Sequence, residues 1–155
     1  MNKEKLAEFI LALKNVRHGS DGLFDLGLAI NESGDKNLED DLLNELKNSL
    51  KIEKIIYNNE LSDDAVIDKL VSFLKTDNWI LLKMEKDLGS VLLNQLKSLS
   101  NTNAFQIFDY EDQAVFSMKI PDNCRIIVLA DRNFIEEKIT YPHFYSLFGP
   151  TLILD

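Results

Sequence analysis

The feature that most constrains the fold is an apolar run near the end of the chain. Five consecutive apolar residues, most of them β-branched, lie between Arg125 and Asp131. A strand that is apolar on both faces belongs in the middle of a parallel sheet that helices cover on both sides. In such sheets the functional groups lie just beyond the carboxyl ends of the strands, so Asp131 and Arg132 become candidate site residues.

A second apolar run, 79–84, ends at an acidic residue. Glu85 follows the run directly, and Asp87 lies two residues further on. ATPases place the carboxylate that orients magnesium and water directly after an apolar strand. Glu85 and Asp87 therefore join Asp131 and Arg132 as candidates for one site, at the carboxyl ends of strands 79–84 and 125–130.

Hydrophobic periodicity assigns the remaining elements. Helices are expected over 3–16, over a shorter stretch that Ser20 or Asp21 would cap and that runs to Ile30, and over 38–50. Strand 52–57 follows, then a helix over 62–74 with Ser62 as its N-cap and a leucine-rich helix over 88–99. Two runs, 104–109 and 114–120, flank a short polar connection and predict an antiparallel hairpin. Short helical segments near 134–138 and 141–148 precede a last strand over 151–154.

This order predicts one α/β domain over 1–155. We expect a three-layer, mostly parallel sheet with helices on both faces and one β-hairpin. Residues 1–51 form a helical N-terminal part, and residues 52–155 form the α/β part.

Composition limits the location and the partners of the protein. No apolar run approaches the roughly 20 residues of a membrane span. The only cysteine, Cys124, leaves no internal disulfide, which fits a reducing compartment and predicts a cytoplasmic protein. The net charge is −9, with 17 basic against 26 acidic residues, and this argues against nucleic acid as a partner.

Motifs for cofactors and metals are missing from the sequence. Neither G-x-x-x-x-G-K-[ST] nor G-x-G-x-x-G occurs. Two histidines and one cysteine make no zinc pattern. Clustered acids such as Asp63 and Asp64 are explained by a favourable position in the first turn of a helix. We therefore expect no cofactor and no metal.

Residues 62–155 resemble the second half of an AAA-type ATPase core, in particular the AAA units of the mysterin-type giant dynein-like ubiquitin-ligase ATPases. The resemblance rests on the order of elements and on the region around Pro142. It is carried by residues 79–85, 88–99, 104–120, 123–130 and 139–148.

The resemblance implies roles for these segments. Strand 79–84 with Glu85 would correspond to a Walker B strand, strand 125–130 with Asp131 to the sensor-1 strand, and the Pro142 segment to the helix that carries an arginine finger. The chain departs from the family at two points. It has no Walker A loop before strand 52–57, and Ser146 and Leu147 stand where the finger is expected. Without these groups, turnover of ATP is not expected.

Three hypotheses about function follow. In the first, the chain is a degenerate AAA-like module without ATPase activity that binds or regulates a protein, for example an active ATPase subunit. In the second, it is a small acidic inhibitor or chaperone of a basic partner, as its net charge suggests. In the third, it is an enzyme that uses Glu85, Asp87, Asp131 or Arg132.

Overall fold

The computed structural model describes residues 2–15, 26–50, 52, 54–59, 61–76, 79–121 and 123–155. The helices are α1 (Lys3–Lys14), α2 (Lys36–Leu50), α3 (Asp63–Leu74), α4 (Ser90–Thr102), α5 (Arg132–Lys138) and the 3-10 helix η1 (Phe144–Leu147). The strands are β1 (Leu26–Asn31), β2 (Lys54–Tyr57), β3 (Trp79–Lys83), β4 (Ala104–Asp109), β5 (Ala114–Lys119), β6 (Arg125–Asp131) and β7 (Phe148–Leu154).

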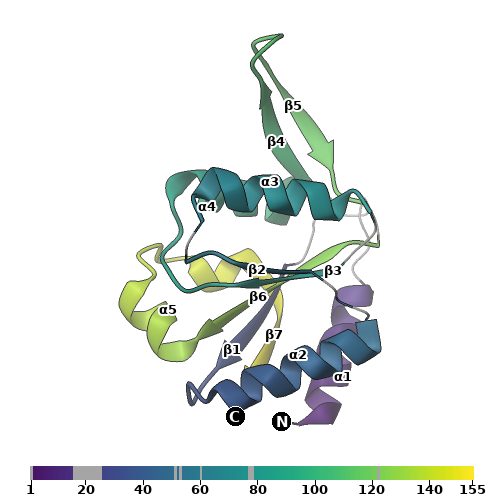
Figure 1. The fold of residues 1–155 in the computed structure, drawn as a ribbon, viewed down its shortest axis with the longest axis vertical. Helices are drawn as coiled ribbons and strands as arrows, with labels where there is room; N and C mark the ends of the chain where they lie inside the picture. The colour runs from purple at the N-terminus through teal and green to yellow at the C-terminus, as the bar shows by residue number, and fades with distance from the viewer. Residues whose placement is uncertain are drawn as a thin grey trace.

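Five strands form one parallel sheet in the order β2-β3-β6-β1-β7 (Figure 1). The predicted central strand is β6, and its residues from Arg125 to Ala130 are all buried. It pairs in parallel with β3 on one side and with β1 on the other. The three-layer α/β architecture predicted from the sequence is therefore confirmed, and the strands ending at Lys83 and Asp131 are neighbours.

One predicted helix is wrong. The stretch expected to be helical up to Ile30 contains β1, whose residues Leu26–Asn31 are all buried between β6 and β7. The earlier part of that predicted helix, with its proposed caps Ser20 and Asp21, lies outside the described residues. The N-terminal part thus supplies α1, α2 and an interior strand. The residues from Leu26 to Ile30 carry no polar side chain, and such a run fits a strand buried on both faces better than an amphipathic helix.

Close packing against α1 fixes β1 in place. A Cβ atom added to Gly27 would lie 2.8 Å from Cδ1 of Leu13 and 2.8 Å from Cζ of Phe9. The guanidinium of Arg125 also binds α1, because its Nε donates to the backbone oxygen of Leu13 at 2.8 Å. Glycine at position 27 therefore lets the helix approach the sheet.

Side chains of the sheet alternate between two apolar cores. Ile127 and Leu129 of β6 pack in the core that α1 and α2 cover, while Ile126 and Val128 pack in the core on the side of α3 and α4. Ile135 of α5 belongs to this second core. The chain therefore leaves β1 through α2 on one face and leaves β6 through α5 on the other.

Two further predictions have clear outcomes. Ser62 is the N-cap of α3, and its Oγ accepts from the amide of Ala65 at 3.2 Å, as expected. The last strand begins earlier than predicted, at Phe148, and includes Pro150. A proline is tolerated there because β7 is the edge strand, where a missing N–H need not break the ladder.

The predicted hairpin is confirmed as β4 and β5, which form a separate two-stranded antiparallel sheet. It extends away from the body of the molecule beyond α3 and α4 (Figure 1).

Within the described part of the chain, no helix is both long enough and apolar enough to cross a membrane.

Candidate functional site

The main candidate site is a cleft of about 310 Å³ at the carboxyl edge of the sheet. It lies where β1, β3 and β6 end. The chain leaves β1 and β6 on opposite faces here, and open α/β sheets bind ligands at such switch points. The cleft is lined by Gly34, Lys36, Glu39, Lys83, Met84, Glu85, Asp131 and Phe134.

A buried lysine lies among carboxylates in this cleft. The Nζ of Lys83 lies 2.5 Å from Oε1 of Glu39 in α2 and 3.4 Å from Oδ1 of Asp131. The Lys83 side chain is only 9% exposed, and that of Asp131 is 40% exposed. A buried ammonium is costly unless it is paired and hydrogen-bonded, so the two carboxylates are what hold this charge in the fold.

The turn between β1 and α2 borders the same cleft. In doubly wound folds the first turn from strand to helix is where phosphate groups bind, on free backbone amides at the helix N-terminus. Here the buried side chain of Asn31 binds this turn. Its Oδ1 accepts from the amide of Gly34 at 3.1 Å, and its Nδ2 donates to the carbonyl of Asp35 at 3.0 Å. The amide of Gly34 is therefore already bonded within the protein.

Glu85 lines the cleft with an exposed carboxylate. Its backbone amide is held in place by Asn58, whose buried Oδ1 accepts from it at 2.6 Å. The Nδ2 of Asn58 donates to the carbonyl of Lys86 at 3.1 Å. Among the described residues, no hydrogen bond or ion pair engages the Glu85 carboxylate itself. Glu85 is therefore the cleft carboxylate most available to a ligand.

Arg132 lies beside the cleft in an ion pair. Its guanidinium donates to both carboxylate oxygens of Glu32, with the shortest contact 2.6 Å, and its Nη1 donates to the Tyr145 hydroxyl at 3.1 Å. The hydrogen bond from Arg132 lowers the pKa of Glu32, against a smaller opposing effect of desolvation. The bonds to Glu32 and Tyr145 likewise raise the pKa of Arg132. Both groups are charged near neutral pH.

Asp87 makes hydrogen bonds that hold two segments of the fold together. Its carboxylate accepts from the hydroxyl of Thr140 at 2.7 Å and from the amide of Leu88 at 2.7 Å. The amide of Thr140 also donates to it, at 3.2 Å. These bonds tie the segment before α4 to the segment after α5. Asp87 does not line the cleft.

The structure thus brings two of the four candidates together. Glu85 and Asp131 line one cleft, Arg132 borders it in a separate ion pair, and Asp87 lies outside it. The sequence did not point to Lys83, Asn31 or Asn58. One signal was available for Lys83, because it is the only charged residue inside the apolar run 79–84.

The charges in the cleft decide what it can bind. Two lysines, Lys36 and Lys83, face three carboxylates, those of Glu39, Glu85 and Asp131, and Lys83 is already paired with two of them. A triphosphate would meet acidic groups and few free cations. Among the residues that the structure describes, no group of three or more His, Cys, Asp or Glu side chains could hold a metal ion.

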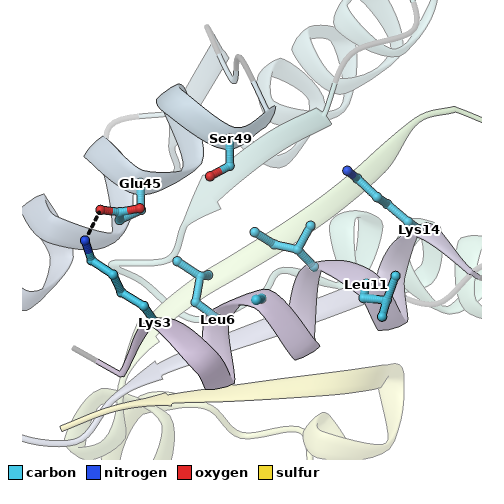
Figure 2. A pocket seen from close by; sticks show the side chains of 8 residues that line it. Lys3, Leu6, Leu11, Lys14, Glu45 and Ser49 are labelled. Atoms are coloured by element: carbon cyan, nitrogen blue, oxygen red, sulfur yellow. Dashed lines mark ion pairs between the residues drawn. The ribbon is translucent and has the colours of Figure 1, made fainter.

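A second hollow, of about 370 Å³, lies between α1 and α2 (Figure 2). Lys3 and Glu45 form an ion pair of 3.5 Å across one end of it, and Lys14 and Ser49 lie toward the other end. Leu6, Ile10 and Leu11 line it between them. This lining offers aliphatic surface and one satisfied ion pair, so it is a packing groove between helices and not a reactive site.

Comparison of the sequence with protein-family models and with curated proteins finds no match.

Proposed function

We propose that this chain is a non-catalytic, AAA-like protein-binding or regulatory module of the cytoplasm that has no ATPase activity. The observation that carries the proposal is the ion pair of Lys83 with Glu39 and Asp131. It lies at the carboxyl edge of the sheet, where a nucleotide and its magnesium ion would have to bind, and there the lysine and two carboxylates are engaged with one another.

The arrangement of strands supports the AAA-like part of the proposal. The resemblance assigns β3 to a Walker-B-like strand and β6 to a sensor strand, and these two are hydrogen-bonded neighbours. On the other side of β6 lies β1, followed by the turn 32–35 and α2. In this comparison β1 and that turn take the place of the strand and loop that bind phosphate in an active ATPase. The resemblance would then extend beyond residues 62–155 into the N-terminal part.

Two properties of the cleft argue against nucleotide binding. The amide of Gly34 is used by Asn31, so the turn offers fewer free donors to a phosphate. The buried lysine is neutralised by carboxylates. Ser146 and Leu147 also provide no guanidinium at the position that the resemblance gives to an arginine finger.

Calorimetry and a phosphate-release assay test this proposal. The purified chain is titrated with ATP and with ADP in magnesium buffer, and an active AAA ATPase serves as the positive control. We expect no binding heat and no phosphate release above a protein-free blank. Magnesium-dependent hydrolysis that disappears in Glu85→Ala would overturn the proposal and establish the enzyme hypothesis instead.

One structural observation supports the acidic-inhibitor hypothesis. The polar turn of the hairpin carries Asp109, Glu111 and Asp112, so part of the net charge of −9 is concentrated on a projecting element. An inhibitor that acts mainly through charge would lose affinity steeply as ionic strength rises. Binding to a basic partner that is unchanged at high salt would exclude this second function.

A further inference from the structure

The β4–β5 hairpin is firmly attached to the body at its base. Phe105 is fully buried there. The side chain of Gln95 in α4 bonds both backbone groups of Gln106, accepting from its amide at 2.9 Å and donating to its carbonyl at 2.6 Å. Ser98 adds a bond to the carbonyl of Ala104 at 2.6 Å. These contacts fix the direction in which the hairpin leaves α4 (Figure 1).

Exposed apolar side chains lie on both faces of the outer half of the hairpin. Neighbouring positions in a strand point to opposite faces, whereas directly paired residues share one face. Phe108 pairs with Val115, so these two lie on one face. Ile107 pairs with Phe116 on the other face, where Ile107 is partly buried against the core and Phe116 is exposed. Phe108, Val115 and Phe116 are 47%, 63% and 49% exposed.

Tyr110 extends the apolar surface to the tip. Its ring packs edge-on against that of Phe108, with 4.7 Å between the ring centroids. Tyr110 is nevertheless 84% exposed. Exposed apolar patches on a folded domain mark interaction sites. A flat partner surface would cover Phe108 and Val115 or Phe116 but not all three, whereas a cleft would cover the exposed apolar side chains of both faces.

The charge at the tip defines the chemistry of that cleft. Residues 104–119 contain three acidic residues and one basic residue. The carboxylate of Asp109 accepts from the amides of Glu111 and Asp112 at 2.9 and 3.3 Å and so shapes the turn. Glu111 and Asp112 are exposed beyond it. Such a tip is repelled by phosphates of nucleic acids and by anionic lipid, and it is attracted to lysine and arginine.

We propose that the β4–β5 hairpin inserts its outer half into an apolar-walled cleft of a partner protein, whose floor carries lysine or arginine side chains that meet Glu111 and Asp112. This inference rests on the proposed function as a protein-binding module and names the surface and the kind of partner involved. The apolar residues supply most of the affinity, while the acidic tip supplies orientation and salt dependence.

Site-specific photo-crosslinking in the cells that make the protein tests the proposal. A benzophenone-bearing phenylalanine analogue replaces Tyr110, and separate control proteins carry it in place of Leu11 in α1 or Tyr57 in β2, which are also exposed. We expect the Tyr110 position to crosslink one partner protein. Mass spectrometry should place the crosslink in a cleft of that partner with apolar walls and basic residues at its floor.

Binding of the purified partner then separates apolar from electrostatic contributions. We expect Val115→Thr combined with Phe116→Thr to weaken binding at least about tenfold. Tyr57→Ser should leave binding unchanged. Glu111→Gln combined with Asp112→Asn should weaken binding and flatten its salt dependence. Circular dichroism and thermal melting of each variant confirm that the fold is retained, since all the changed side chains are exposed.

The other outcomes overturn the inference and separate it from the proposed function. Crosslinks only from the Leu11 or Tyr57 positions would leave a protein-binding module whose docking surface is not the hairpin. Crosslinks from Tyr110 to a second copy of the chain, or to a flat or acidic surface, would refute the partner cleft. Crosslinks from none of the three positions would refute the hairpin as a docking surface, while ATP hydrolysis by the purified chain would refute the absence of ATPase activity without bearing on the hairpin.

Discussion

The ammonium group of Lys83 lies 2.5 Å from the carboxylate of Glu39, two residues that are 44 positions apart in the chain. The contact joins the end of β3 to the first turns of α2, across the end of β6. Because Asp131 also contacts Lys83, one cation ties three elements together at the carboxyl edge of the sheet. This arrangement leads to the first prediction.

Replacing Lys83 by methionine should destabilise the protein by about 1–3 kcal/mol. The change leaves Glu39 and Asp131 without their counter-charge, but both carboxylates are partly exposed, so the loss is smaller than for a fully buried pair. Urea unfolding followed by circular dichroism measures the effect. The matched control is Lys36→Met, an exposed lysine in the same cleft, which should change the unfolding free energy by less than about 0.5 kcal/mol. If Lys83→Met and Lys36→Met change the unfolding free energy equally, the ion pair of Lys83 does not contribute to stability.

Gly27→Ala distinguishes the strand from the helix that the sequence suggested. In the interior of a helix, alanine would stabilise the protein by about 0.5–1 kcal/mol relative to glycine. In β1 the new Cβ meets Leu13 and Phe9 at 2.8 Å, so these side chains must shift and the protein should lose about 1–3 kcal/mol. Thermal melting gives the sign directly. A stabilised Gly27→Ala variant would contradict the packing of α1 against β1.

The elements predicted correctly are those whose local sequence pattern is compatible with only one type of secondary structure. Strand β6 follows from five apolar residues in a row, and α3 follows from its Ser62 cap and its apolar stripe. Strand β1 was missed because Ser20 and Asp21 suggested the cap of a short helix running to Ile30, although Leu26, Leu28 and Ile30 alternate with the two-residue period of a strand. Only pairing with β6 and β7, which lie about 100 residues further along the chain, decides between the two.

The candidate site was predictable only in part for a similar reason. The rule that functional groups follow buried strands located Glu85 and Asp131 in one cleft. The same rule also selected Asp87, whose bonds to Thr140 depend on how a distant segment packs. No local pattern could pair Lys83 with Glu39, because their contact depends on α2 crossing the face of the sheet.

The Glu32–Arg132 ion pair should give the protein a small acid-sensitive contribution to stability. Arg132 lowers the pKa of Glu32 in the folded state, so the contribution is complete above the unfolded pKa of about 4.3. It is lost as the pH falls through the lower folded-state value. Urea unfolding of the wild type and of Glu32→Gln should therefore differ near neutral pH and converge in acid. The control is Glu136→Gln, which removes an exposed glutamate of α5. If the unfolding free energies of the wild type and of Glu136→Gln also differ near neutral pH and converge in acid, the loss of one negative charge is enough to explain the effect, and the ion pair is not needed.

Asn58 should be essential for the position of Glu85. Its buried side chain accepts from the amides of Glu85 and Lys86 and donates to the carbonyl of Lys86, so Asn58→Ala leaves three backbone groups without this partner. We expect a loss of about 1–3 kcal/mol in urea unfolding. Hydrogen exchange should also become faster at the amides of Glu85 and Lys86. The neighbouring Asn59→Ala, at an exposed position, is the matched control and should change neither measurement. Unchanged exchange in Asn58→Ala would mean that another contact holds this edge of the cleft.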